Sequence, residues 1–427
     1  MSNCAIVGIN WGDEGKGRMV DYFAGQYQVV VRYQGGNNAG HTVINEYGKN
    51  ALNLLPSGIF HPETINLLGA GTVVDLKHLC GEIEKLRAKG VKIGPENLKI
   101  SDRAMMVLPI HPAQDQWEEE RLGKNAYGST RRGISPIYGD KYMKKAIQMG
   151  DLLHPESLEN HLHRLIDWKN TVIVKGYGQK EISYNEVLEW IHTYGDALKP
   201  YICDAFELLE SAQAAGKNIM FEAQLGALRD IDYGIYPYTS SSNPISAYAP
   251  VGCGCPMLKV DEVVGVTKAY STCVGEGPFT CELFGDEAKV LRDAGHEYGA
   301  ATGRPRRVGP FDVVASRYGV KLQGADEIAL TKLDVLTGMK LGVTVGYEID
   351  GKRTQDFPYG EALNRAKPVN IELPGWSEDI SGCRSEEELP ENARRYIDFL
   401  EKNVGCAITY VSVGAERDQY IKRTPKI

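Results

Sequence analysis

Two adjacent carboxylates lie inside a glycine-rich segment near the N-terminus. The segment reads GDEGKGR over residues 12–18 and connects an apolar run to a predicted helix. A glycine loop between a strand and a helix presents backbone N–H groups that bind phosphate. A carboxylate at such a place repels phosphate unless a cation lies between them or the carboxylate takes up a proton. We therefore interpret Asp13 as a metal ligand, a general base or both; the alternative is that Asp13 only caps the helix.

This loop is an incomplete match to the phosphate-binding pattern G-x-x-x-x-G-K-[ST]. Asn10 stands where the first glycine belongs, and Gly17 replaces the hydroxyl residue that binds magnesium. Lys16 is retained. The motif alone therefore leaves a plain turn as an alternative.

A second glycine segment, YQGGNNAGHT over residues 33–42, follows the next predicted strand. It offers the amide of Asn38, backbone carbonyls and the imidazole of His41, which can donate a hydrogen bond to an oxygen that gains charge. Parallel neighbours place their carboxyl ends at one edge, so this segment is predicted to lie next to the first. A third segment, NAYGSTRRGISP over residues 125–136, adds hydroxyls and arginines, whereas the acidic run at 118–120 is interpreted as a solvated helix face.

A later strand ends in T-K-x-D at residues 331–334, a pattern that resembles the base-reading element of GTP-binding proteins. There a carboxylate, here Asp334, accepts from the N1–H and the 2-amino group of guanine, while the stem of Lys332 packs on the ring. Adenine lacks that donor pair, so the carboxylate selects GTP over ATP. The segment SVGAE at residues 412–416 is expected to complete the guanine pocket with backbone N–H groups.

The segment GAATGRPRR at residues 299–307 is the most basic stretch in a chain of net charge −8. Guanidinium groups bind carboxylates and phosphates bidentately. A solvent-facing charge cluster is the alternative, but flanking glycines and an internal proline favour a shaped loop. The overall acidic balance excludes a protein that coats nucleic acid, because such a surface is basic.

The elements that must position these loops are short β-branched runs alternating with helical ones. Strands separated by helices indicate βαβ crossovers, hence an α/β fold with a large, mostly parallel sheet flanked by helices. Ligands of such sheets bind beyond the carboxyl ends of the strands. Strands are predicted at 4–8, 28–32, 218–221, 263–266, 327–330, 343–347 and 408–412, and helices at 15–23, at 75–87 after an N-cap at Asp75, and after Ser183 in a capping box.

Length and composition set the remaining limits. A chain of 427 residues predicts one large or two ordinary domains at about 150 residues each, and no linker divides it, so we expect one domain over 1–427. Ordinary hydrophobic and charged contents, 42% and 24%, exclude disorder. No apolar run reaches the roughly 18 residues of a membrane helix. Nine scattered cysteines and an N-terminus without a basic or apolar leader are typical of a cytoplasmic protein.

Taken together, the segments WGDEGKGR, VVRYQGGNNAGHT, LPSGIF, GAATGRPRR and LTKLDVL resemble the adenylosuccinate synthetase family in order and spacing, from about Ala5 to Arg417. The resemblance implies a single α/β domain with a P-loop-NTPase-like GTP site, usually in a homodimer. It also implies Mg²⁺- and GTP-dependent condensation of IMP with L-aspartate to adenylosuccinate, GDP and phosphate, the first committed step from IMP to AMP.

The resemblance further implies roles for particular residues. Asp13 is expected to take the N1 proton of IMP, so that the 6-oxygen attacks the γ-phosphate and forms 6-phosphoryl-IMP. His41 is expected to protonate the departing GDP, and Lys16 to neutralise phosphate charge. Mg²⁺ is expected at the Asp13 carboxylate and the Gly40 carbonyl. The implied GTP site comprises Gly12, Asp13, Glu14, Gly15, Lys16, Gly17, Arg18, Gly40, His41, Thr42, Arg306, Lys332, Leu333, Asp334, Gly414, Ala415 and Glu416. The implied IMP site comprises Asp13, Glu14, Gly15, Lys16, Asn38, Ala39, Gly40, His41, Thr130, Lys144, Gln224, Leu225, Ser240 and Arg304. The implied aspartate site comprises Ala300, Ala301, Thr302, Gly303, Arg304, Pro305 and Arg306.

Four positions depart from the commoner family pattern. The amide expected at the IMP site is displaced by one residue, from Leu225 to Gln224, and we hypothesise that Gln224 serves in its place. Lys144 replaces an arginine usually lent by the partner subunit, Ser240 replaces a threonine, and Pro305 replaces an arginine without an assigned contact.

Two other functions remain as alternatives. A GTP-binding switch would share the phosphate loop and T-K-x-D but has no need of the acidic pair or the arginine loop. A sibling ligase, in which dGMP replaces IMP, would retain most motifs but is expected to lack the loop aspartate, which this chain has at Asp13.

Overall fold

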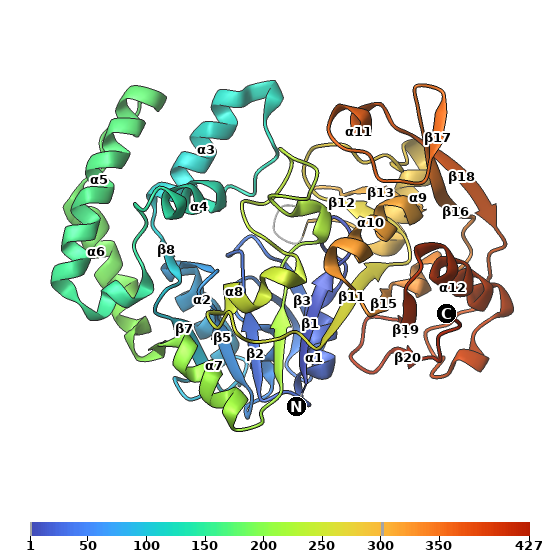
Figure 1. The fold of residues 1–427 in the computed structure, drawn as a ribbon, viewed down its shortest axis with the longest axis horizontal. Coiled ribbons are helices and arrows are strands. Elements are labelled where there is room, and N and C mark those ends of the chain that lie inside the picture. The colour runs from blue at the N-terminus through green and yellow to red at the C-terminus, as the bar shows by residue number, and fades with distance from the viewer. Residues whose placement is uncertain (1, 300–302) are drawn as a thin grey trace.

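The computed structural model describes residues 2–299 and 303–427. Within these ranges, ten strands form one sheet that is parallel except for its last strand, β20. In spatial order the strands are β20 (Tyr420–Lys422), β19 (Ala407–Ser412), β15 (Glu327–Thr331), β11 (Glu262–Lys268), β1 (Asn3–Gly8), β10 (Ile219–Glu222), β2 (Val29–Arg32), β5 (Ile65–Leu68), β7 (Leu98–Ser101) and β9 (Ile202–Cys203). The α/β architecture with a large, mostly parallel sheet is confirmed (Figure 1).

Successive side chains of a strand point to opposite faces of the sheet. Helices cover both faces of this sheet, so the side chains of the central strands are buried on either face. On β1, Ala5 and Val7 pack with α7 (Ala205–Ala214) and α8 (Ala249–Cys253). Cys4 and Ile6 pack on the other face against α1 (Lys16–Ala24). The phosphate-type loop is therefore held between a strand buried on both faces and a packed helix.

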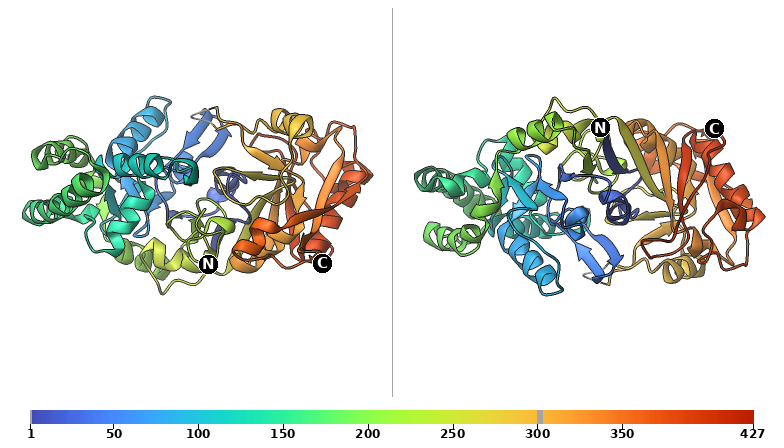
Figure 2. Two further views of the ribbon diagram at one scale, coloured as in Figure 1. Left: turned by 90° about the horizontal axis from the view of Figure 1, so that it is seen from above. Right: turned by 90° about the horizontal axis from the view of Figure 1, so that it is seen from below.

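Some of the other helices lie at the two ends of the molecule. In Figures 1 and 2, α5 and α6 lie at one end of the long axis and α12 at the other. The α-helices whose bounds have not yet been given are α2 (Leu76–Arg87), α3 (Ile110–Leu122), α4 (Ile134–Tyr142), α5 (Pro155–Tyr177), α6 (Tyr184–Gly195), α9 (Gly285–Gly295), α10 (Val313–Gln323), α11 (Glu361–Arg365) and α12 (Glu391–Val404). No helix within the described ranges is long and apolar enough to cross a membrane.

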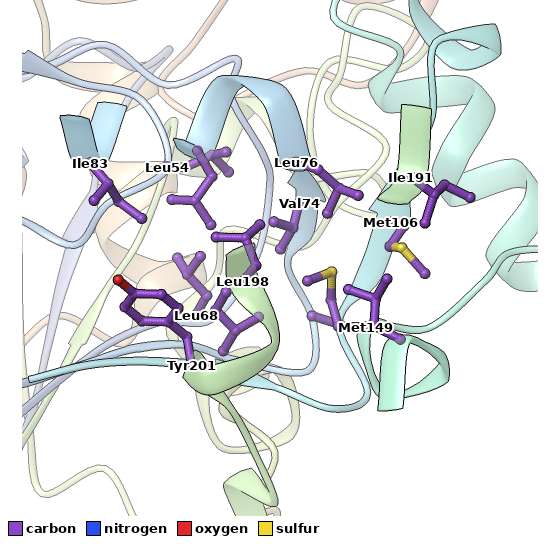
Figure 3. Packing of buried hydrophobic residues seen from close by; sticks show 14 of the residues in the cluster. Leu54, Leu68, Val74, Leu76, Ile83, Met106, Met149, Ile191, Leu198 and Tyr201 are labelled. Atoms are coloured by element: carbon purple, nitrogen blue, oxygen red, sulfur yellow. The ribbon is translucent and has the colours of Figure 1, made fainter. Parts of the chain in front are cut away.

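The hydrophobic core of the α5/α6 half joins the sheet to these helices. Figure 3 shows its centre, where Leu68 of β5 and Leu76 of α2 pack in one cluster with Ile191 of α6. The predicted N-cap at Asp75 is confirmed, because Asp75 accepts from the N–H of His78 at the start of α2. At the start of α6, Ser183 accepts from the N–H of Glu186, but the described hydrogen bonds do not include the return bond from the Ser183 N–H to the Glu186 side chain that a capping box requires.

A second sheet lies apart from the main one and contains the strand predicted at 343–347. That strand, β16 (Leu341–Ile349), runs antiparallel to β17 (Lys352–Thr354) and β18 (Lys367–Leu373) and pairs with β14 (Phe311–Asp312). β16 therefore lies outside the large, mostly parallel sheet. Three short pairs complete the described strands: β3 (His41–Asn45) with β4 (Gly48–Leu52), β6 (Val73–Asp75) with β8 (Met105–Val107), and β12 (Ser271–Cys273) with β13 (Arg307–Gly309).

The first two glycine segments lie next to each other as predicted, since a Cβ at Gly17 would lie 2.5 Å from that of His41, but they do not follow neighbouring strands. β10 lies between β1 and β2, so the two segments do not follow adjacent strands. The carboxyl ends of β15, β11, β1, β10 and β2 nevertheless lie at one edge of the sheet. The segments that carry the predicted chemistry leave from that edge.

Candidate active site

The first glycine loop separates its two carboxylates. Glu14 is buried, and its Oε1 accepts from the N–H of Gly12 at 2.8 Å and of Asn10 at 3.2 Å. Its Oε2 pairs with the buried Lys16 Nζ at 2.6 Å. The Glu14 side chain thus holds the loop in shape through these N–H groups, and Lys16 neutralises its charge. Only the backbone of Glu14 therefore remains available to a ligand.

Asp13 is turned the other way. Its φ of 60° lies in the left-handed region, which Asp adopts more readily than most residues with a side chain. The side chain is 26% exposed, and Oδ2 lies 3.0 Å from Nη2 of Arg306. The loop therefore presents one carboxylate to solvent-accessible space, next to the arginine loop.

Two cavities meet at Asp13. One has a volume of about 530 Å³ and the other about 970 Å³. Of the residues expected at the IMP site, Asn38 and Thr130 line both cavities with Asp13, while Leu225 and Ser240 line the smaller one. The larger cavity is also lined by Ala39, Gly40, Thr42, Arg304, Pro305 and Arg306.

His41 forms a buried pair with Glu222, the last residue of β10. Its Nδ1 lies 2.5 Å from Glu222 Oε1, and Ser57 donates to the same carboxylate from its N–H at 2.7 Å and its hydroxyl at 2.6 Å. Burial lowers the pKa of His41, although Glu222 opposes this shift. Burial opposes ionisation of Glu222, but His41, Arg32 and Ser57 hold the pKa of that carboxyl below its usual value. Nδ1 of His41 therefore faces an ionised carboxylate, which leaves Nε2 for a ligand, and Nε2 can donate to a ligand oxygen when the ring is protonated.

Sequence analysis missed Glu222 because no motif surrounds it. It ends a short apolar strand, and its partner His41 is 181 residues away. A charged residue in the last position of a buried parallel strand was the available signal, since such positions lie beside the ligand-binding edge.

Gln224 does not lie at the surface of either cavity. It is fully buried, its Oε1 accepts from Arg32 Nη2 at 2.5 Å, and its Nε2 donates to Asn38 Oδ1. Leu225, with a φ of 63°, lines the smaller cavity instead. The structure thus does not support direct contact of Gln224 with IMP; Gln224 lies behind Asn38 and holds it.

The T-K-x-D segment carries an unsatisfied acceptor. Asp334 Oδ1 is buried without a hydrogen-bond partner among the described residues, and burial raises the pKa of this carboxyl. Lys332 has a φ of 60°, which lets the chain turn sharply after β15. The Thr331 hydroxyl donates to the carbonyl of Glu14 at 2.6 Å, so this segment is fixed to the phosphate-type loop. A vacant buried acceptor is what the two donors of guanine would satisfy.

Arg18 connects the same loop region to the turn at 414–416. Its guanidinium donates to Ser412 Oγ at 2.7 Å and to the carbonyls of Gly414 and Glu416, and it lies 4.2 Å from the centre of the Tyr420 ring. Arg18 is one of the residues expected at the GTP site. Its side chain shapes the turn that is expected to hold the base, with Ala415 exposed at its tip.

The arginine loop reaches the site through Arg306. Nη1 of Arg306 pairs with the buried Glu297 at 2.6 Å, while Nη2 contacts Asp13. Arg304 is exposed and pairs with Glu276 at 2.9 Å. Gly303 and Pro305 are exposed. The expected aspartate-binding residues Ala300, Ala301 and Thr302 lie outside the described residues.

The acidic run at 118–120 is more than a solvated face. Glu119 is buried, and its carboxylate accepts from the N–H groups of Tyr127, Gly128 and Ser129 at 3.0–3.1 Å. This correction has a functional consequence, because Glu119 fixes the segment that carries Thr130 at the rim of both cavities.

The donor set fits a hard divalent cation. Mg²⁺ takes oxygen ligands and is usually bound by one or two protein groups together with substrate phosphates. The Asp13 carboxylate and the backbone of Gly40 line the same cavity, and space beside Gly40 is open. No group of three or more His, Cys, Asp or Glu within the described ranges forms a metal cage, which such a site does not require.

Comparisons with known proteins identify the family of the chain. The family model for adenylosuccinate synthetase matches residues 5–421. Adenylosuccinate synthetases of Caldanaerobacter subterraneus subsp. tengcongensis and Streptococcus sanguinis are 45% and 44% identical to the chain, covering 99% and 98% of it and 99% and 97% of their own length.

Solved structures extend the likeness to the fold. The fully ligated adenylosuccinate synthetase from Plasmodium falciparum matches with a TM-score of 0.93 and 35% identity, over 99% of this chain and all of that one. A cyanophage S-2L succinoaminodeoxyadenylate synthetase, 21% identical over 99% of this chain and 95% of its own, shares the fold with a TM-score of 0.58. The chain therefore belongs to the adenylosuccinate synthetase family.

Proposed function

We propose that the chain forms adenylosuccinate at the two cavities that meet at Asp13. As a member of its family, the chain is a carbon–nitrogen ligase of purine biosynthesis that joins IMP to L-aspartate, with GTP as co-substrate and Mg²⁺ as cofactor. The observation that carries the residue assignment is the position of Asp13, which lines both cavities and contacts Arg306.

Asp13 acts as the general base in this proposal. Its carboxylate takes the N1 proton of IMP, and the 6-oxygen then attacks the γ-phosphorus of GTP as the bond to GDP breaks. The oxygen of IMP, a poor leaving group, becomes part of a phosphate ester. The amine of L-aspartate then displaces phosphate from carbon 6. A positioned general base contributes about 10²- to 10⁴-fold to such a step.

The remaining proposed roles follow the geometry. The N–H groups of residues 12–17 and the N-terminus of α1 bind phosphate oxygens, and His41, oriented by Glu222, donates to the departing GDP. Arg304 and Arg306 hold the carboxylates of aspartate. Mg²⁺, held by Asp13 and Gly40 when bound, offsets phosphate charge.

The proposal assigns a separate pocket to each nucleotide. Lys332, Asp334 and the turn at 414–416 hold guanine, in support of which Asp334 has a vacant buried acceptor. Asn38, Thr130, Leu225 and Ser240 hold IMP in the smaller cavity, in support of which all four line it.

We further propose a homodimer in which Lys144 completes the partner's IMP site. Lys144 is exposed, has a φ of 61° and lies outside the two cavities of its own chain, and Tyr142 and Met143 beside it are exposed by 68% and 49%. A mixture of Lys144→Ala and Asp13→Asn subunits tests this. Heterodimers then contain one intact site, so an equal mixture recovers roughly a quarter of wild-type activity; no recovery excludes action across the interface.

The nine cysteines are free thiols in the structure, which supports a reducing compartment such as the cytoplasm as the place of action.

Substrate omission tests the function. With GTP, Mg²⁺, IMP and L-aspartate present, the chain is expected to form adenylosuccinate, and omission of any one is expected to stop it. Phosphate release from GTP alone would instead support a switch, and turnover with dGMP but not IMP would support the sibling ligase. Asp13→Asn is expected to lower kcat by at least about 10²-fold. Its matched control is Asp204→Asn at the N-cap of α7, where asparagine caps equally well.

A further inference from the structure

Glu297 is a buried carboxylate at which four donors from three separate segments meet. It follows α9 and has no exposed surface. Oε1 accepts from Lys268 Nζ at 2.8 Å, from the Tyr270 hydroxyl at 2.6 Å and from Lys332 Nζ at 3.2 Å. Oε2 accepts from Arg306 Nη1 at 2.6 Å. No motif pointed to this residue.

The charges around Glu297 explain why it stays ionised. Burial opposes ionisation, but Lys268, Lys332 and Arg306 hold the pKa of Glu297 well below its usual value. Burial also lowers the pKa of Lys268 to about 8. With Asp13 on the far side of Arg306, three cations face two carboxylates. Loss of Glu297 would leave the cations to repel one another in a poorly solvated space.

Two of these cations belong to different substrate sites. Arg306 lies on the arginine loop, and its other nitrogen contacts Asp13 at 3.0 Å. Lys332 follows β15, where its ammonium also donates to the carbonyl of Gly295 at 2.6 Å. The backbone reinforces the connection, because the N–H of Arg306 donates to the carbonyl of Glu297 at 2.9 Å. One side chain therefore joins the arginine loop to the guanine-reading segment.

We propose that Glu297 is a positioning residue that orients Arg306 toward L-aspartate and Lys332 toward guanine, and so sets both substrate sites together. This inference rests on the proposed roles of those two cations. Glu297 touches no substrate and acts through them. If Glu297 only stabilised the fold, its replacement would lower the melting temperature and leave the kinetics of the folded enzyme unchanged.

The test replaces Glu297 by Gln, which keeps the shape and removes the charge, and by Asp, which keeps the charge. Steady-state rates of the full chain are measured with IMP, GTP and L-aspartate varied in turn, well below the melting temperature of each variant. Glu297→Gln is expected to raise KM for GTP and for L-aspartate by about tenfold each, equivalent to about 1.4 kcal/mol, and KM for IMP by less than about twofold. Glu297→Asp is expected to restore part of the loss.

Glu401→Gln is the matched control. Glu401 is equally buried, pairs with Arg423 Nη1 at 2.8 Å and accepts from the N–H groups of Ile408 and Lys426. Within the described ranges, none of these partners belongs to a proposed site. Its substitution is expected to lower the melting temperature and to change no KM. Equal changes in all three KM values for Glu297→Gln, or changes no larger than those of the control, would overturn the inference.

A milder variant keeps the test decisive if Glu297→Gln does not fold. Tyr270→Phe removes one donor to Glu297 and keeps the buried ring. It is expected to raise KM for GTP and for L-aspartate by about threefold and to leave KM for IMP unchanged. Unchanged KM values for GTP and L-aspartate would contradict the proposal. A wild-type chain that fails to join IMP and L-aspartate would refute the proposed function itself, which separates the two failures.

Discussion

Replacement of Glu222 by Gln tests how the chain handles the proton at His41. The change keeps the volume of a fully buried side chain and removes its charge. In the wild type, Glu222 accepts from His41 Nδ1 at 2.5 Å and from both donors of Ser57. Gln has one acceptor oxygen and an NH₂ group, so the amide must face at least one of these donors. An imidazolium at position 41 loses the anion that stabilises it.

The magnitude follows from that contact. A hydrogen bond to a charged group contributes about 1.5–3 kcal/mol, and its loss in the transition state lowers kcat by roughly 10- to 150-fold. KM for GTP is expected to change by less than about threefold, because ground-state binding relies mainly on the loop backbone and the guanine contacts.

The pH dependence gives a second readout. Burial already lowers the pKa of His41, and Glu222 is the group that opposes this. Without Glu222 the pKa of His41 falls further, so the protonated ring is scarcer at any given pH. The loss of kcat is therefore expected to be larger at pH 8 than at pH 6. Stopped-assay measurements of adenylosuccinate across this range provide the profile.

A kcat within twofold of wild type at both pH values would refute the assignment of Glu222 and return His41 to a purely structural role. Glu401→Gln serves as the control for removing a buried, ion-paired carboxylate away from the site. It is expected to reduce the melting temperature without changing the shape of the pH profile.

Three further predictions concern base reading, packing and pH-dependent stability. Asp334→Asn is expected to raise KM for GTP by about 10- to 100-fold, by loss of charged hydrogen bonds, and to admit xanthosine triphosphate, whose 2-oxo group accepts from the new amide; competition assays that show unchanged preference remove Asp334 from the guanine site. Gly17→Ala places a Cβ 2.5 Å from that of His41, so we expect a loss of about 1–3 kcal/mol in stability and a fall in kcat; a wild-type melting temperature and kcat would show that the contact relaxes. Burial raises the pKa of Asp312 from its ordinary 3.8 to about 6, so the folded state binds this proton more tightly and stability falls as pH rises from about 4 to about 6. Since one pKa unit corresponds to about 1.4 kcal/mol, this change in stability totals roughly 3 kcal/mol. Asp312→Asn can still cap α10 with its oxygen, and its NH₂ group can donate to the Tyr347 hydroxyl oxygen. It is expected to remove this pH dependence in urea titrations, and an unchanged pH dependence would exclude Asp312 as its source.

Local sequence determined the parts of the site whose geometry is set by the backbone. Glycine at 12 and 15 permits the positive φ angles of the first loop, and a strand followed by a helix fixes where the loop opens. The T-K-x-D segment identified Asp334 without any knowledge of the fold. Such features depend on a few consecutive residues, so they can be read from the chain alone.

Other features depend on which side chains become buried and which partners they contact. The spacing of residues along the chain does not show this. The sequence placed Glu14 and Asp13 together as one acidic pair, whereas the structure turns one inward to close the loop and the other outward. It offered Gln224 as the IMP-contacting amide, but Arg32 and Asn38 take up that side chain and leave Leu225 at the cavity.

The long-range partners were decided by tertiary structure alone. Glu222 reaches His41 across 181 residues because β10 inserts between β1 and β2. Glu297 reaches Lys332 and Arg306 because the end of α9 faces the carboxyl edge of the sheet at β11 and β15. The sequence by itself therefore determined which groups could bind phosphate and guanine, while the fold decided which buried carboxylates orient them, because a charge inside a protein is stable only where distant segments bring it compensating donors.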